Sequence, residues 1–100
     1  MELRFEWDEK KNIINQKKHG VAFEEAEKVF FDPNRYEMFD EIYSLFEKRW
    51  IILGLAGLKI LKVVFTERNG IIRIISARKA DKHEEEVYFY GYGTKNSKFR

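Results

Sequence analysis

The most constraining feature of this chain is a pair of long β-branched runs joined by Asn69-Gly70. The first run reads LKILKVVFTER over residues 58–68, and the second reads IIRIISARK over residues 71–79. Asn-Gly is the strongest short hairpin signal, because a two-residue type I′ turn needs positive φ at both positions. The two runs therefore predict neighbouring antiparallel strands.

Two more strand-like segments precede this hairpin. They read RYEMF over residues 35–39 and EKRWIILGL over residues 47–55. Both are rich in aromatic or branched residues, which favours strands. Ala56-Gly57 separates the second segment from the hairpin and predicts another two-residue turn.

The first third of the chain has helical spacing instead. Asp8 predicts the cap of a helix that continues through EKKNIINQKK and ends at Gly20. Its apolar contacts are expected from three residues: Trp7, Ile13 and Ile14. A second helix is predicted through FEEAEKVFFD, before Pro33. A third is predicted after Asp81, through KHEEEVYFYG.

This order of elements predicts an α+β fold. Two N-terminal helices are expected to pack on an antiparallel three- to four-stranded sheet, followed by a C-terminal helix. A chain of 100 residues has room for one hydrophobic core. We therefore expect a single domain over residues 1–90 and a flexible tail over residues 91–100.

The composition excludes several kinds of site. The chain has no cysteine, which removes disulfides, thiolate metal sites and a Cys nucleophile. His19 and His83 are too few for a zinc cluster, so we expect chemistry without a metal or other cofactor. No apolar run approaches the roughly 20 residues that span a bilayer, and the N-terminus lacks the apolar region of a secretory signal. We expect a cytoplasmic protein without membrane contact.

The charge is unevenly distributed. Residues 1–50 hold 9 basic and 12 acidic residues, whereas residues 51–100 hold 10 basic and 5 acidic residues. A basic second half favours a polyanion as ligand.

The turn lengths predict which face each strand residue occupies. A two-residue Asn69-Gly70 turn pairs Thr66 with Arg73 and Lys62 with Ala77, and a two-residue Ala56-Gly57 turn pairs Leu53 with Ile60. One face then carries six polar residues: Glu47, Arg49, Lys62, Thr66, Arg68 and Arg73. The core face carries Trp50, Ile52, Leu61, Val63, Phe65, Ile72 and Ile74. Arg78 is expected to have the opposite parity to Arg73 and to reach towards the first helix.

Two interpretations of the polar face stay open at this point. It is either a ligand site or a solvated surface with cross-strand ion pairs, each worth roughly 0.2–1 kcal/mol.

Several segments together resemble the BrnT family of bacterial toxins. They are FEWDEKKNIINQKKHGVAFEEAEKVFFD, EKRWIILG and KILKVVFTERNGIIRIISARKADKHEEEVY, and they cover about residues 4–90 in order. The blocks WDE-KN, KHGV-F-EA and IRIISAR-A are each moderately specific, and their succession is highly specific. Family motif positions fall on Lys18, His19, Glu47, Arg49, Arg68, Arg73, Ser76 and Arg78.

This resemblance implies a RelE-like fold and a ribonuclease toxin of a type II toxin–antitoxin pair. Its implied activity is metal-independent RNA cleavage that blocks translation and growth. Its implied partner is a BrnA-like antitoxin, through which alone the toxin would meet operator DNA.

Such cleavage uses the 2′-hydroxyl of the RNA as the nucleophile, so the enzyme must move protons and stabilise charge on the phosphate. We expect Arg49, Arg73 and Arg78 to clamp the phosphate, because a guanidinium meets phosphate oxygens bidentately. Glu47 and His19 are candidates for acid–base roles. RNA-binding roles are expected for Lys18, Lys62 and Arg68.

Alternatives to these roles remain. Glu47 among arginines has a lowered pKa and is a weak base, so it is also a candidate for orienting the arginines. His19 is equally suited to bonding the last carbonyl groups of its helix. The whole chain is alternatively a non-catalytic RNA-binding or protein-interaction module.

Overall fold

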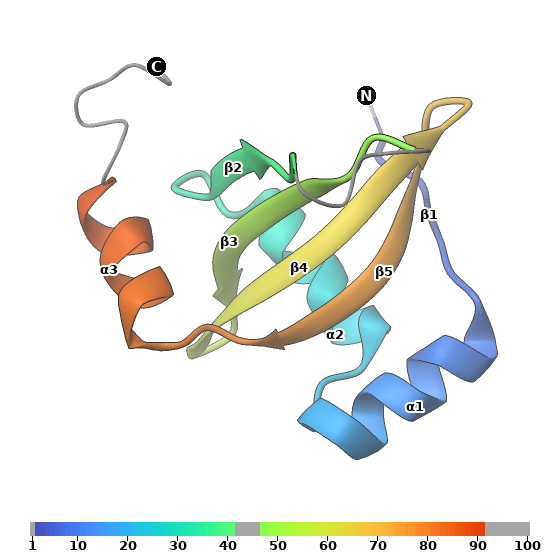
Figure 1. Ribbon diagram of the computed structural model, residues 1–100, viewed down its shortest axis with the longest axis horizontal. Helices are drawn as coiled ribbons and strands as arrows, with labels where there is room; N and C mark the ends of the chain where they lie inside the picture. Colours follow the sequence, from blue (N-terminus) through green and yellow to red (C-terminus); the bar gives the residue numbers. More distant parts are fainter. Residues whose placement is uncertain (1, 42–46, 92–100) are drawn as a thin grey trace.

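The computed structural model describes residues 2–41 and 47–91, which form one five-stranded sheet with helices on both sides (Figure 1). The elements in chain order are β1 (Phe5–Glu6), α1 (Glu9–His19), α2 (Phe23–Ala26), the 3₁₀ helix η1 (Glu27–Phe31), β2 (Tyr36–Phe39), β3 (Trp50–Ala56), β4 (Lys59–Arg68), β5 (Ile71–Lys79) and α3 (Lys82–Tyr90). None of the described helices is long and apolar enough to cross a membrane.

The α+β class is confirmed, but the predicted sheet was incomplete. The strand order is β1-β5-β4-β3-β2, and β1 runs parallel to β5, so the sheet is mixed rather than antiparallel. A two-residue strand carries no alternation that the sequence could reveal, which is why β1 was missed. The predicted tail was residues 91–100. Gly91 caps α3 in the left-handed conformation, and residues 92–100 lie outside the described residues.

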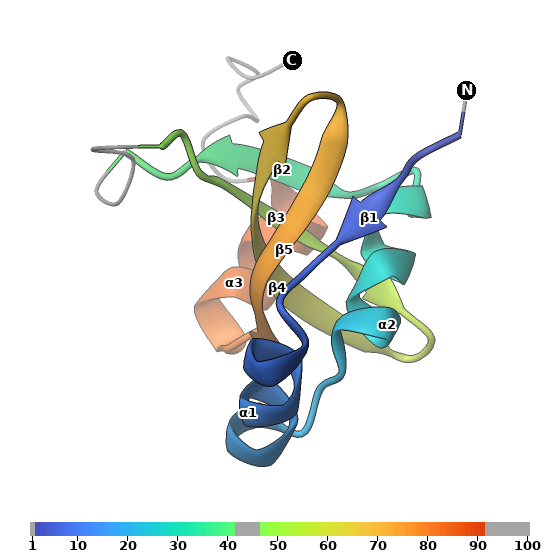
Figure 2. The ribbon, with the colours of Figure 1, turned by 90° about the vertical axis from the view of Figure 1, so that its right-hand side faces the viewer.

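The two faces of the sheet are covered differently. Figure 2 shows α2 and η1 on one side and α3 on the other. The first side holds the core, where Phe23 and Val29 pack against Ile52, Val63 and other buried strand residues. The opposite side is called the outer face below.

The predicted ends of α1 are confirmed, and so is the predicted contact of Trp7, which packs against the core, but the predicted packing of Ile13 and Ile14 is wrong. Asp8 accepts hydrogen bonds from two backbone N–H groups of the first turn, and Gly20 has a φ of 72°. Ile13 and Ile14 are exposed, however, and the buried residues of the helix are Asn12 and Asn15.

The side-chain amides of both buried asparagines form hydrogen bonds with backbone groups of neighbouring elements. The Oδ1 atom of Asn12 accepts the N–H of Phe23 at 2.8 Å, at the start of α2. The Nδ2 atom of Asn15 donates to the carbonyl groups of Val21 and Ala77, and its Oδ1 atom accepts the N–H of Ala77. Because these bonds satisfy buried polar groups, the amides hold α1 to β5 and α2.

The β4–β5 hairpin has the predicted turn and an unpredicted bulge. Arg68 pairs with Ile71 and Thr66 with Arg73, as the Asn69-Gly70 turn requires. The register then shifts between Val64 and Phe65, leaving Ile75 without a partner opposite. Beyond this bulge the predicted pairing of Lys62 with Ala77 is wrong, because Lys62 pairs with Arg78.

The β3–β4 turn lies one residue later than predicted. Ala56 pairs with Lys59, so Gly57 and Leu58 form the turn, and Leu53 pairs with Lys62 instead of Ile60. The pairing moves by two residues, which preserves the face of every side chain. Trp50 and Ile52 therefore lie on the predicted core face, whereas Glu47 and Arg49 precede the observed strand.

Gly54 is required by the close approach of β3 to η1. A Cβ atom at this position would lie 2.8 Å from the Cβ of Val29 and 3.0 Å from its carbonyl oxygen. Both atoms belong to or adjoin the backbone, so they cannot rotate away.

We expect Gly54→Ala to lower the free energy of unfolding by about 1–3 kcal/mol, as overpacking of a tight core contact does. Chemical denaturation measures this, with Leu58→Ala in the exposed turn as the control. An unchanged midpoint for Gly54→Ala would show that η1 moves away without penalty.

Candidate functional site

Charged side chains gather on the outer face where β3 begins, β4 ends and β5 begins. We call Glu47, Arg49, Arg68 and Arg73 the arginine cluster. Arg68 and Arg73 share this face, Arg68 bonds Glu47, and the charges of Arg49 and Arg73 also act on the Glu47 carboxylate.

Carboxylates already hold two of the guanidinium groups. Glu47 accepts both Nε of Arg68 at 2.6 Å and Nη2 at 3.1 Å, which is a bidentate pair. Glu6 of β1 accepts Nη1 of Arg73 at 3.3 Å. Beneath them, the buried Thr66 donates its hydroxyl hydrogen to the carbonyl of Lys48 at 2.7 Å, which fastens the segment before β3 to β4.

The cluster lowers the pKa of Glu47. The hydrogen bond from Arg68 is the main cause, and the charges of Arg68, Arg49 and Arg73 add to it against a smaller effect of desolvation. The same bond raises the pKa of Arg68. Glu47 is therefore a stable anion that orients Arg68, and it is poorly suited to accept a proton near neutral pH.

A second polar group lies on the same face at the other end of β4. Arg78 donates Nη1 and Nη2 to the two carboxylate oxygens of Glu84, both at 2.9 Å, and Lys62 lies 3.8 Å from Glu84. The predicted reach of Arg78 towards the first helix is wrong, because the bulge turns Arg78 to the face of Lys62, where it meets α3.

His19 and Lys18 lie apart from the arginine cluster. They belong to the last turn of α1, which joins β5 through Asn15 at Ala77. Ala77 is four residues, or about 13 Å, along the strand from Arg73. Figure 1 shows α1 at the opposite end of β5 from the hairpin turn.

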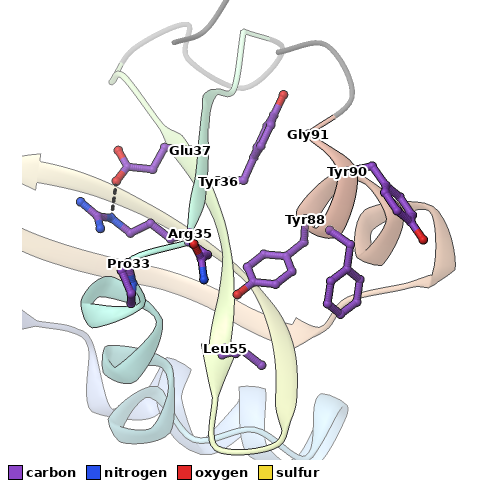
Figure 3. Close-up of a pocket in the computed structure, with 10 residues that line it drawn as sticks. Pro33, Arg35, Tyr36, Glu37, Leu55, Tyr88, Tyr90 and Gly91 are labelled. Atoms are coloured by element: carbon purple, nitrogen blue, oxygen red, sulfur yellow. Dashed lines mark hydrogen bonds and ion pairs between the residues drawn. The ribbon is translucent and has the colours of Figure 1, made fainter. Parts of the chain in front are cut away.

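A hollow of about 840 Å³ lies between α3 and the segment that leads into β2 (Figure 3). Two of its lining residues, Tyr88 and Leu55, bond the buried Asp32, which accepts the hydroxyl of Tyr88 at 2.5 Å and the backbone N–H of Leu55 at 2.8 Å. In Figure 3 the hydroxyl of Tyr88 points towards β3, whereas Tyr90 points away from it.

The Asp32–Tyr88 hydrogen bond changes the pKa of both groups. Burial of the Asp32 carboxyl raises its pKa, but the bond from Tyr88, two backbone N–H groups and the charge of Arg35 outweigh burial, so the pKa is lowered. Burial, followed by the bond and charge of Asp32, raises the pKa of Tyr88 to about 12.

Sequence reasoning missed the carboxylates that hold these groups. Glu6 lies on the two-residue strand that was not predicted, and Glu84 was placed only within the predicted C-terminal helix, with no partner assigned. Asp81-x-x-Glu84 is a capping-box pattern, and that box is formed, but the pattern does not reveal the bond to Arg78. Over residues 2–41 and 47–91, no three His, Cys, Asp or Glu side chains gather as a metal ion would require.

The structure is that of a small α+β protein with arginines and carboxylates on one face of a mixed sheet. The family model described as ribonuclease toxin, BrnT, of type II toxin-antitoxin systems matches residues 7–84. The chain therefore belongs to the BrnT family of ribonuclease toxins. A search of curated proteins found no match. The matched range contains all of the arginine cluster as well as Arg78 and Glu84.

The Asp32–Tyr88 bond leads to a prediction about pH. We expect Tyr88→Phe to lower the free energy of unfolding at pH 7 by about 1.5–3 kcal/mol, the usual value for a hydrogen bond to a charged group. The raised pKa of Tyr88 contributes stability that is present below pH 10 and lost as the pH rises towards 12. The lowered pKa of Asp32 contributes stability above the ordinary Asp value that is lost in acid.

Denaturation at pH 7, at pH 11 and at a pH below the ordinary Asp value of 3.8 measures both effects. The difference in stability between the wild type and Tyr88→Phe should be largest at pH 7 and should shrink at pH 11. Phe89→Leu, an exposed change on the same helix, is the control. A difference that is constant from pH 7 to pH 11 would show that the variant loses only packing.

Proposed function

We propose that the arginine cluster binds the scissile phosphate of RNA and that the chain is a metal-independent endoribonuclease. Membership in a ribonuclease toxin family supports an RNA substrate. The observation that carries the proposal is the position of Arg68 and Arg73 on one sheet face beside Glu47, which bonds Arg68 and also feels the charges of Arg49 and Arg73. Planar guanidinium groups fixed in this way suit phosphate oxygens.

In the proposed reaction the 2′-hydroxyl oxygen attacks the adjacent phosphorus. The O2′–P bond forms and the P–O5′ bond breaks, leaving a cyclic phosphate and a 5′-hydroxyl. The 2′-hydroxyl proton passes to a base and the departing oxygen takes up a proton. The arginines stabilise the charge that builds on the phosphate, a contribution of about 10²–10³-fold for each donor.

The proposed roles follow the positions of the side chains. Arg49 and Arg73 clamp the phosphate, and Glu47 orients Arg68 at the rim. His19 and Lys18 lie in α1 at the other end of β5, so we assign them no acid–base role. Lys62 and Arg78 extend the positive surface along β4 and bind RNA beyond the phosphate that is cut. We assign the general acid and general base roles to water and to the RNA itself, and the arginines supply electrostatic stabilisation.

We also propose the biological setting that the resemblance implies. The chain would block translation and growth by cutting RNA, within one domain of RelE-like arrangement over residues 1–90. Its protein partner would be a BrnA-like antitoxin, and operator DNA would be bound through that antitoxin alone.

Arg49→Ala and Arg73→Ala should each lower the rate of RNA cleavage by about 100-fold or more, because one fixed donor to the phosphate is lost. Purified variants and labelled RNA in the presence of EDTA measure this. Arg35→Ala is a matched control, since Arg35 is also ion-paired, to Glu37, but lies at the β2 edge.

Induced expression in bacteria extends the test to growth and translation. Full cleavage by Arg73→Ala would refute the site, and loss of wild-type cleavage in EDTA would refute metal independence. Salt-dependent RNA binding by the wild type without new RNA ends would favour the non-catalytic binding module.

A further inference from the structure

A second cavity, of about 380 Å³, lies between α3 and the outer face of the sheet. Its apolar walls come from β2, β3 and α3, and its polar end comes from β4 and the start of α3. The lining residues are Tyr36, Met38, Ile51, Leu53, Lys62, His83, Glu84 and Val87. A volume of this size is typical of a small-molecule site with few polar groups.

The polar end offers one cation and one anion in fixed positions. Glu84 is held by both Nη atoms of Arg78 and by the backbone N–H of Asp81, and its side chain is 17% exposed. Lys62 stands 3.8 Å from Glu84, which is longer than a hydrogen bond, so its ammonium group keeps donors for a ligand. The Oε2 atom of Glu84 accepts one bond from Arg78 and has capacity for another.

The cavity lies on the same face of the sheet as the arginine cluster. Lys62, Val64, Thr66 and Arg68 alternate onto the same face of β4. Lys62 and Thr66 are four residues apart, or about 13 Å along the strand. The half-buried side chain of Val64 lies between Lys62 and Thr66 on this face. An RNA strand held at the cluster can therefore follow β4 to the cavity.

We propose that this cavity is a base-selecting subsite that takes one unpaired guanine of the RNA substrate. The flat ring lies between the apolar walls, with Tyr36 and Met38 on one side and Val87 on another. Guanine presents a carbonyl oxygen beside N–H groups on one edge, which matches a Lys62 donor and a Glu84 acceptor. The inference rests on the proposed function, because it names a part of the substrate of that same surface.

Two variants test the subsite by different means. Lys62→Met removes the ammonium group and keeps the length of the side chain, while Arg78 still holds Glu84. Met38→Trp fills the cavity from the edge strand β2. The controls are Lys59→Met, on the other face of β4 and paired with Glu25, and Leu58→Trp in the exposed turn.

The experiment maps cleavage of a random-sequence RNA pool by each purified, folded variant. We expect the wild type to prefer guanine at one position a fixed number of nucleotides from the cut. Both test variants should reduce that preference about tenfold or more, the effect of losing one good base contact. Met38→Trp should still cut RNA, Lys62→Met should cut RNA more slowly because it also loses an RNA contact, and the two controls should keep the wild-type preference.

Other outcomes overturn the inference and remain separable from failure of the proposed function. Cleavage without a positional guanine preference, or with the same preference in both variants, refutes the subsite while the ribonuclease stands. An unchanged cleavage pattern with loss of antitoxin binding in Met38→Trp would assign the cavity to the protein partner. Absence of cleavage by the wild type refutes the proposed function itself.

Discussion

The arrangement of the outer face depends on one extra residue in β5. Ile75 has no partner opposite, and this bulge changes the parity of every later residue of the strand. Ile74 and Ala77 can therefore both be buried although they are three residues apart. By the same shift, Arg73 and Arg78 reach the same face from positions five residues apart. Without the bulge, Arg78 would point into the core side and α3 would lose the partner of Glu84.

Local sequence patterns, such as helix caps and turns, predicted most of the fold. They did not predict the long-range contacts. Asp8 and Asp81 cap the starts of helices and Gly20 caps the end of one. Each cap depends on only a few neighbouring residues, and the structure confirms all three. The alternation of side chains from the predicted turn placed Glu47 on the polar face. Glu47 does bond Arg68 of that face, although the turn lies one residue later than predicted. Nothing in IIRIISARK marks Ile75 as a bulge, however, and polar residues in a charged helix are normally read as surface. Buried amides such as Asn12 become visible only when their backbone partners are known.

The arginines of the outer face are ordered before any ligand arrives. Arg68, Arg73 and Arg78 each bond a carboxylate from a different part of the chain, which removes much of the freedom of three long side chains. An incoming phosphate must compete with those carboxylates, so part of the attraction is offset. In return, the guanidinium groups need little reorganisation on binding.

The side-chain amide of Asn15 has a consequence for how copies of the chain meet. It bonds both backbone groups of Ala77, and β1 pairs with Ile72 and Arg73 further along the same strand. The edge of β5 that faces away from β4 is thereby protected, although β1 contributes only two strand residues to it. Among the described residues, the other border of the sheet is β2, with four residues. A border this short offers little template for the strand-to-strand association that leads to aggregation.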